Sequence, residues 1–426
     1  MMLRCLIPSV IWPFAGPAAS LLLPEAKRII HMFSHPEKQD RYFPWADRLF
    51  RINPYPWYDK ARAEHPVYRM ENGEIVLTRY HDVMKWLKAP LGATHFGNGP
   101  WNNFDNTVLN IDPPEHTTLR RYSNKWFTPK LVNQYITTAK ELAENALDRY
   151  SDGSVMDAFY ELAVVPPHAT MCRALGVPDD DAGLIYRHFL TCTDALGHGV
   201  GRDDTEKATQ SFDYLFERCK KYIEEKRHNP GVGPHGLVDD FLKLADEGKM
   251  SERTVLETLV LFYGSGSPNP ATVIASGLNH FAREPETFEL YRTQTGERDA
   301  IINELLRLYP AEISMIRYAT EDTEIGGIPV SKGTPVRSVI AAANRDPDFF
   351  DNPHEFNHKR PPETSMNLTF GVGHHACAGQ LISRAAIRAV FDAVAKKATR
   401  ILSAGEAGLA HTDRVRGYLS LPLRIY

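Results

Sequence analysis

The spacing of apolar residues predicts a chain that is mostly helical. Apolar positions recur every three to four residues over six segments, which is the periodicity of an α-helix with a buried face. The predicted helices cover residues 131–149, 205–226, 254–263, 271–282, 300–308 and 381–401. The last segment carries a continuous apolar stripe, which is typical of a helix buried in a protein core.

Strand-like patterns are short. Residues 67–70 and 74–78 flank Asn72-Gly73, which predicts a hairpin with a type I′ turn because both residues tolerate positive φ. Residues 325–330 and 334–341 flank Lys332-Gly333 and predict a second hairpin. Strands do not alternate with helices, and no G-x-G-x-x-G motif follows a strand, which argues against a Rossmann or barrel fold. The expected fold class is mainly α with a small antiparallel β region.

Composition narrows the range of partners. The 426 residues are 43% hydrophobic and 24% charged, as in an ordinary globular protein. Lys and Arg total 49 against 53 Asp and Glu, and the net charge of −4 argues against nucleic-acid binding. No repeat or low-complexity linker interrupts the chain from residue 53 onward, so we expect a single domain over residues 41–426.

The N-terminal segment has two interpretations. Residues 5–24 are uncharged and long enough to cross a bilayer, and Arg4 before them gives a signal-like pattern. Four prolines interrupt the segment, and proline breaks the hydrogen bonding of a helix. We therefore expect residues 1–40 to be a flexible extension, or the product of a start codon placed upstream of Met32. The rest is expected to be cytoplasmic without membrane association; a weak anchor or signal is the alternative.

One cysteine stands in a chemically distinctive segment. The cysteines show no C-x-x-C pairing, which indicates a reducing compartment rather than a disulfide framework; they are Cys5, Cys172, Cys192, Cys219 and Cys377. Residues 370–379 read F-G-V-G-H-H-A-C-A-G and directly precede the buried helix. Such a loop delivers the Cys377 sulfur to a helix N-terminus, where free amides favour a thiolate. A thiolate held in this way is a natural ligand of haem iron.

Two other roles for Cys377 are open from the residues alone. A cysteine before a helix is more often a small buried apolar side chain. His374, His375 and Cys377 also offer three zinc ligands, although no further Cys or His pair at ligand spacing supports a zinc site.

The full spacing F-G-x-G-x-H-x-C-x-G resembles the haem-binding signature of the cytochrome P450 family. Other segments match that family in its order: residues 53–56 at the start of the fold, 112–120 at a helix opening, the E-x-x-R of 304–307, and 344–360 before the cysteine loop. The resemblance covers about residues 45–426. It implies the cytochrome P450 fold and a haem-thiolate monooxygenase.

The resemblance also assigns roles around haem b (iron protoporphyrin IX). It implies that Cys377 is the iron ligand and that the surrounding loop contacts the haem through Phe370, Gly371 and Gly379. Haem propionates are expected to be held by His116, Arg120, Arg317 and His375; the first two lie four residues apart and share a helix face. A structural charge cluster that fixes the cysteine loop is expected from Glu304, Arg307 and Arg360.

The chain departs from the family in its distal helix. The family's acid–alcohol pair, which delivers protons during oxygen activation, falls on Pro268 and Asn269, and Pro270 follows. Two prolines are expected to open the helix around residues 264–270 and to free carbonyl groups for water or substrate. We assign Gly266, Pro268 and Asn269 to catalysis at this opening.

Three explanations of this departure are open. In the first, Asn269 with water or a substrate oxygen relays protons in an O2-dependent monooxygenase. In the second, the enzyme is a peroxygenase that uses hydrogen peroxide. Peroxygenases of fatty acids are expected to place an arginine near the gap, and residues 254–282 contain none, which disfavours this explanation. In the third, the protein does not activate oxygen, as in an isomerase or a non-turnover haem-binding protein, or has drifted from activity.

The resemblance also indicates which residues form the substrate pocket and which could dock the electron donor. The pocket residues expected by resemblance are Phe96, Trp101, Phe104, Ser314 and Ile316. The aromatic and amide side chains of residues 93–110 favour a compact oxygenated or aromatic substrate, unless the polar ones face water. Hydroxylation and oxidative O-demethylation both remain open. Electrons are expected from a separate ferredoxin and ferredoxin reductase, docked on Arg120, Arg121, Lys125 and Arg384.

Overall fold

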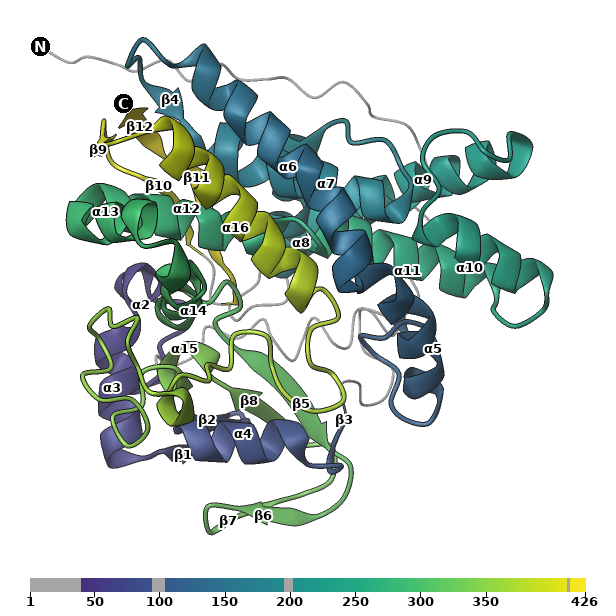
Figure 1. Cartoon of the computed structure of the whole chain (residues 1–426). Helices are drawn as coiled ribbons and strands as arrows, with labels where there is room; N and C mark the ends of the chain where they lie inside the picture. Colours follow the sequence, from purple (N-terminus) through teal and green to yellow (C-terminus); the bar gives the residue numbers. More distant parts are fainter. Residues whose placement is uncertain (1–39, 94–103, 195–201, 412–413) are drawn as a thin grey trace, which may run out of the picture.

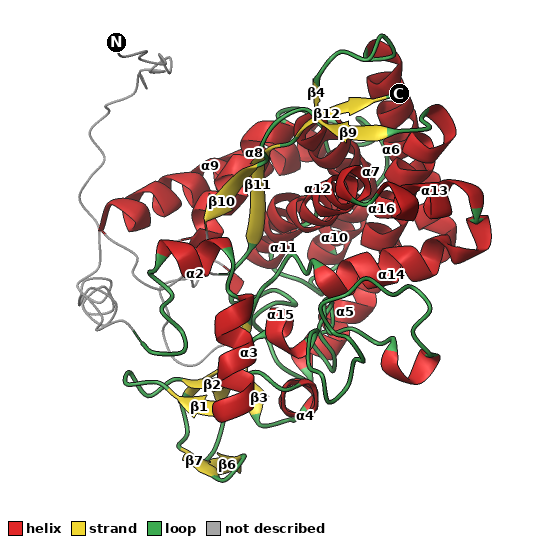
Figure 2. Ribbon diagram, turned by 90° about the vertical axis from the view of Figure 1, so that its left-hand side faces the viewer, coloured by secondary structure: helices red, strands yellow, loops and turns green. Residues whose placement is uncertain are grey.

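The structure is a computed structural model that describes residues 40–93, 104–194, 202–411 and 414–426. Figures 1 and 2 show a helical body with a β-sheet at one end. Its helices are α2 (Arg48–Ile52), α3 (Tyr55–Glu64), α4 (Tyr80–Lys88), α5 (Glu115–Asn124), α6 (Pro129–Arg149), α7 (Val165–Leu175), α8 (Ala182–Asp194), α9 (Arg202–His228), α10 (Leu237–Asp246), α11 (Glu252–Ser265), α12 (Pro268–Arg283), α13 (Pro285–Thr293), α14 (Arg298–Leu308), α15 (Ile340–Ala343) and α16 (Gln380–Lys397). All six predicted helices are confirmed.

The largest difference among them concerns the end of α16. Apolar periodicity predicted a helix to residue 401, but α16 ends at Lys397, and Ile401 begins strand β9 (Ile401–Ser403). Ile401 is buried in the strand, as it would be in a longer helix, so apolarity alone does not distinguish a helix end from the strand that follows it.

The largest sheet has the order β1-β2-β8-β5-β3 and is formed by β1 (Val67–Arg69), β2 (Ile75–Leu77), β3 (Gly92–Ala93), β5 (Met315–Ala319) and β8 (Pro335–Ser338). Its pairs are antiparallel except for β2 with β8, which run parallel. The smaller antiparallel sheets contain β4 (Met156–Asp157), β6 (Thr323–Ile325), β7 (Ile328–Val330), β9, β10 (Gly408–His411), β11 (Arg416–Ser420) and β12 (Pro422–Ile425). The mainly α class with a small β region is confirmed.

The first predicted hairpin forms, but its turn differs from the type I′ prediction. Among the turn residues only Gly73 takes a positive φ, of 88°, and its N–H donates to the Met70 carbonyl over 2.9 Å. The side-chain oxygen of Asn72 accepts a 3.0 Å hydrogen bond from the N–H of Glu74. Asn72 therefore stabilises the turn through its side chain and stays outside the left-handed region.

The second predicted hairpin is wrong. Residues 325–330 do not form one strand, because Gly326 and Gly327 take φ values of 57° and 82° and turn β6 back onto β7. Strand β8 instead pairs with β5 and β2, and residues 340–343 form the short helix α15. Two adjacent glycines are themselves a signal for a two-residue hairpin turn. The apolar residues on either side of Gly326-Gly327 resembled one continuous strand and concealed this signal.

Helix α12 lies at the centre of the helical body, between α16, α7 and α11 (Figure 2). Most of its residues are buried, and Gly277 packs where a Cβ atom would lie 2.4 Å from the ring of Phe391 on α16. The absence of a side chain at Gly277 thus lets α12 and α16 approach closely. This packing fixes α12 relative to the loop that precedes α16.

Within the described residues, no helix is both long and apolar enough to cross a bilayer.

Candidate functional site

A cavity of about 480 Å³ is bounded by α5, α11, α12, the segment from α14 to β5, and the loop before α16. Cys377 lines this cavity, as do both neighbouring residues of the loop, Ala376 and Ala378. The sulfur is open to the cavity, whereas the other described cysteines, Cys172, Cys192 and Cys219, are buried in helices. The one distinctive cysteine of the sequence is therefore the one that faces the cavity.

Backbone contacts hold the cysteine loop in shape. The N–H of Cys377 donates to the Phe370 carbonyl over 2.8 Å, and the N–H of Ala376 donates to the Gly373 carbonyl over 3.1 Å. Gly371 and Gly373 take φ values of 66° and 82°, which L side chains rarely adopt. The guanidinium of Arg384 lies 5.3 Å above the ring of Phe370 and supports the loop from α16.

The electrostatics of Cys377 differ from the prediction of a thiolate stabilised by the helix terminus. Burial raises the pKa of the thiol above its ordinary value, and the Gly379 amide and the charge of Arg120 only partly oppose this effect. Enclosure in the cavity wall thus outweighs the helix N-terminus. A cation bound at the sulfur would favour the thiolate that the protein alone does not.

The side chains predicted to bind propionates lie together: Arg120, Arg317 and His375 line the cavity, and His116 packs against His375. Arg120 donates to the Ala376 carbonyl over 2.9 Å, and His375 donates from Nε2 to Asp112 over 2.8 Å. The rings of His116 and His375 lie 4.5 Å apart. Burial lowers the pKa of Arg317 to about 10, and burial followed by the charge of His375 lowers that of His116 to about 4.

These residues fit a haem with two propionates. His116 is buried at 3% exposure, and its Nε2 atom has no hydrogen-bond partner, which is costly unless a ligand supplies one. An anionic group at this edge would pair with His116, Arg120 and Arg317 while the iron lies at the Cys377 sulfur. The donor set and the orphaned nitrogen thus agree with the cofactor expected from the resemblance.

The predicted charge cluster is present next to the loop. Glu304 accepts from Arg307 over 2.6 Å and from Arg360 over 3.0 Å, and it also accepts from the Asn357 N–H over 2.9 Å. Arg307 further donates to the carbonyls of Asn344, Pro353 and Glu355. All three charged residues are buried, so the cluster ties α14 to the segment that leads to the cysteine loop.

The distal helix is interrupted where two prolines predicted an opening. Helix α11 ends at Ser265 and α12 begins at Pro268, so the prolines stand in the first turn of a new helix, where a missing N–H costs least. Ser267, between the helices, is buried and lies 3.4 Å from Nδ1 of His168 on α7. The break is therefore packed against α7.

The predicted distal residues are placed differently around this break. Gly266 and Asn269 line the cavity, together with Pro270, whereas Pro268 is buried and does not line it. The Oδ1 atom of Asn269 is buried without a hydrogen-bond partner. Asn269 is thus the residue of this segment that presents an unsatisfied polar group.

The predicted pocket residues are also divided. Phe104 and Ile316 line the cavity, but Ser314 is buried and accepts a 3.0 Å hydrogen bond from Arg337. Phe96 and Trp101 lie outside the described residues.

Sequence reasoning missed several lining residues, and four of them show how separate elements contribute to the cavity. They are Met171 of α7, Phe212 of α9, Glu312 after α14 and Arg414 before β11. Phe212 lies in the predicted helix of residues 205–226 but was assigned no pocket role, and Met171 lies outside every predicted helix. Glu312 and Arg414 belong to no motif. The β-bridge between Glu312 and Val415, which brings the last two elements together, has no signal in the sequence.

A basic depression lies outside the cysteine loop. It is lined by His116, Thr117, Arg120, Arg121, Asn124, Lys125 and His374. Arg121 and Lys125 are exposed and flank the ring of Tyr122. Arg384, which was predicted to join them, is half-buried and donates to the side chain of Asn303 over 2.9 Å.

The zinc alternative finds no support in the geometry. His374 lines the outer depression, while Cys377 faces the main cavity. In the described part of the chain, no group of three His, Cys, Asp or Glu residues is arranged to hold a metal ion.

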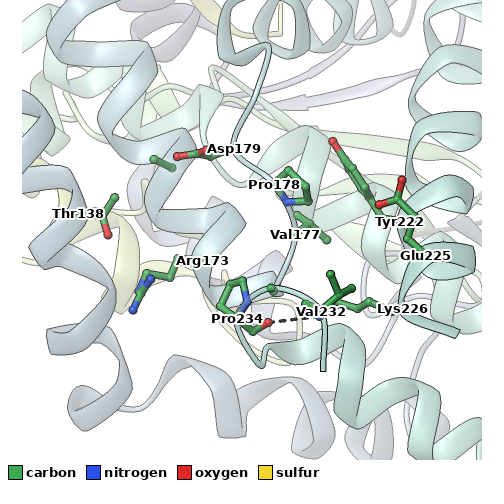
Figure 3. A pocket seen from close by; sticks show the side chains of 13 residues that line it. Thr138, Arg173, Val177, Pro178, Asp179, Tyr222, Glu225, Lys226, Val232 and Pro234 are labelled. Atoms are coloured by element: carbon green, nitrogen blue, oxygen red, sulfur yellow. Dashed lines mark hydrogen bonds between the residues drawn. The ribbon is translucent and has the colours of Figure 1, made fainter. Parts of the chain in front are cut away.

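A second cavity, of about 280 Å³, lies between α7, α9 and the loop before α10 (Figure 3). Its buried cation, Lys226, already donates to the Pro234 carbonyl over 3.2 Å and to Asp239 over 2.9 Å. None of the predicted site residues lines it, so the chemistry gathers at the first cavity.

Comparisons with known proteins agree with this site. The family model described as Cytochrome P450 matches residues 298–395. Cytochrome P450 109 of Bacillus spizizenii is 31% identical over 349 residues, covering 79% of this chain and 82% of its own. Cytochrome P450 monooxygenase PikC of Streptomyces venezuelae is 27% identical, covering 88% and 92%. The ligand-free crystal structure of Mycobacterium smegmatis CYP164A2 has a TM-score of 0.81 and 26% identity, covering 89% and 98%.

These likenesses extend well beyond the cysteine loop from which the resemblance was first drawn. They include the helical body, the five-stranded sheet and the segment that carries Glu304 and Cys377. The chain belongs to the cytochrome P450 family of haem-thiolate monooxygenases, and it is an oxidoreductase.

Proposed function

We propose that this enzyme inserts one oxygen atom from O2 into a small organic substrate, by hydroxylation or oxidative O-demethylation, in the cytoplasm. The observation that carries the proposal is that Cys377 and Asn269 line one cavity, the first from the haem loop and the second from the helix break. Haem bound at Cys377 supplies the oxygen chemistry.

The chain's own residues then position the substrate and exclude water from the cavity. The cavity wall is largely apolar, with aromatic rings contributed by Phe104, Phe127, Phe212 and Phe262, and this lining suits a compact organic substrate. The unsatisfied oxygen of Asn269 is free to accept a proton-bearing group, from ordered water or from the substrate. This supports Asn269 as the residue that takes part in proton delivery in place of the family's acid–alcohol pair.

Electrons are proposed to come from a ferredoxin and its reductase. The basic depression with Arg121 and Lys125 lies beside the loop that carries Cys377, and an acidic partner would be attracted to it. Charge reversal in Arg121→Glu and Lys125→Glu is expected to slow turnover with an acidic ferredoxin several-fold at low salt. Lys140→Glu, at an exposed position on α6, is the matched control. Unchanged turnover in the double variant at low salt contradicts this docking site.

Peroxide-driven oxidation is the second candidate function, because an arginine lines the cavity after all. The absence of an arginine from residues 254–282 disfavours it, but Arg414 lines the same cavity from the C-terminal hairpin. The deciding experiment compares product formed with NAD(P)H, ferredoxin and reductase against product formed with hydrogen peroxide alone. The proposal requires the redox chain to give clearly more product; efficient turnover with peroxide alone would establish the second candidate.

A further inference from the structure

Two side chains of opposite charge line the cavity and do not belong to the set of residues predicted to hold haem. Glu312 follows α14 and Arg414 precedes β11. Backbone hydrogen bonds join their segments: the N–H of Ile313 donates to the Arg414 carbonyl over 2.7 Å, and the N–H of Arg416 donates to the Ala311 carbonyl over 2.9 Å. A β-bridge between Glu312 and Val415 completes the contact. Both charged residues are therefore carried on backbone that is held in place.

These two charges do not neutralise each other through direct contact. Among the described residues, no ion pair joins Glu312 to Arg414, although each lines the same cavity. Burial raises the pKa of Glu312, and the charge of Arg414 and the amide of Asn269 only partly oppose this effect. The guanidinium of Arg414 thus stands in the cavity without a bound carboxylate, beside a carboxyl group whose ionised form is disfavoured.

The other cations of the cavity have a different partner. Arg120 and Arg317, with His375 and His116 beside them, form the edge that fits two propionates, which would neutralise the charge of the two arginines. This leaves Arg414 as the positive group that remains for a substrate. The buried, unpartnered Oδ1 of Asn269 adds an acceptor for a hydroxyl or N–H group of the same substrate.

We propose that Arg414 selects substrates that carry a carboxylate, with Asn269 and Glu312 receiving a hydrogen-bond donor of the same molecule. This inference deepens the proposed function and rests on it. A compact hydroxylated or amino-substituted carboxylic acid meets both requirements. A substrate with a cationic group is disfavoured, because Arg414 would repel it.

The test uses probes that reach the cavity whatever the shape of the natural substrate. N-alkylimidazoles ligate haem iron through their ring, so a charged tail of variable length samples the cavity wall. Holoenzyme is titrated with imidazoles whose tails, two to six carbons long, end in a carboxylate, an amine or a methyl group. The shift of the Soret band gives the dissociation constant, and the tightest ligand of each series is compared.

The expected result is that the best carboxylate tail binds at least about tenfold more tightly than the best amine tail, as for one charge-assisted contact. Arg414→Met should abolish this preference, and Arg414→Lys should retain it in part. Glu312→Gln should preserve or increase it. Arg400→Met, which removes an exposed arginine away from the cavity, controls for net charge and should leave the preference unchanged.

The outcomes separate this inference from the proposed function. If unsubstituted imidazole fails to shift the Soret band, the haem site itself is wrong. If imidazole binds but the wild-type enzyme shows no preference, or prefers the amine, the role of Arg414 is wrong and the haem site stands. A carboxylate preference that survives in Arg414→Met also overturns the inference.

Discussion

The N–H of Cys377 donates a 2.8 Å hydrogen bond to the carbonyl of Phe370, and this contact closes the loop that presents the sulfur to the cavity. The closure depends on two glycines with left-handed backbone, Gly371 and Gly373. They differ in surroundings: a Cβ atom at Gly373 would lie 2.6 Å from the Leu87 carbonyl, whereas one at Gly371 would lie 3.6 Å from the sulfur of Met315.

The two glycines should therefore respond differently to alanine. Gly371→Ala is expected to cost about 1–2 kcal/mol, which is the penalty for a left-handed residue with a side chain. Gly373→Ala should cost more and lower haem retention, because the loop must move away from Leu87. Urea unfolding and the haem content after gel filtration measure both effects. Equal losses in the two variants would show that the contact with Leu87 does not constrain the loop.

A second prediction compares two Glu–Arg pairs with the same spacing. Glu304 and Arg307 are buried, whereas Glu289 and Arg292 pair at the surface with side-chain exposures of 53% and 32%. Glu304→Gln should destabilise the fold by about 3–5 kcal/mol, since it leaves the charges of Arg307 and Arg360 buried without their anion. Glu289→Gln should change the free energy of unfolding by less than about 1 kcal/mol. Similar losses in the free energy of unfolding in the two variants would contradict a structural role of the cluster.

The contrast between these pairs shows what the sequence can predict. The two pairs have the same local pattern, and only the family motif distinguished Glu304-x-x-Arg307 as important. The sequence also predicted that Arg360 would join them, and the structure brings all three together. Family motifs carry such information because they mark positions whose contacts the fold fixes, even between segments as far apart as those of Glu304 and Arg360.

Contacts between segments outside such motifs carry no comparable signal. Glu312 and Arg414 reach the cavity through a bridge between segments about a hundred residues apart, and neither belongs to a motif. The break of the distal helix was predicted because prolines act locally, but the position of His168 against Ser267 was not. Local chemistry therefore predicted the haem side of the cavity better than the substrate side.

A third prediction concerns pH and His168. Burial lowers the pKa of this histidine, which contacts Ser267 and Cys172, so the folded state binds a proton less readily than the unfolded chain. Its contribution to stability is thus present above pH 6.5 and is lost as the pH falls below it. Between pH 7.5 and 5.5 the loss from this single group is at most about 1.4 kcal/mol.

Urea unfolding at the two pH values measures this loss. His168→Asn should show a smaller pH dependence than the wild type, whatever its absolute stability, while the exposed His81→Asn should retain the wild-type dependence. A His168→Asn variant with the full wild-type pH dependence would rule out His168 as a contributor.

A fourth prediction concerns the proton relay at Asn269. Asn269→Ala removes the unsatisfied amide of the cavity and should lower the product formed per NAD(P)H oxidised several-fold, within the range of positioned proton donors. Asn269→Thr should retain part of the coupling because a hydroxyl can also pass a proton. The carbon monoxide difference spectrum should stay as in the wild type in both variants. Unchanged coupling in Asn269→Ala would place the proton delivery elsewhere.

The central claim is that the Cys377 sulfur binds haem iron, and the reduced carbon monoxide difference spectrum tests it most directly. Cys192→Ala, in the core of α8, is the matched control because it removes a buried thiol away from the cavity. The wild type and Cys192→Ala should show the strongly red-shifted Soret band of a thiolate-ligated haem, and Cys377→Ala should lose it. A wild-type spectrum without that band, or a Cys377→Ala variant that keeps it, would contradict the account.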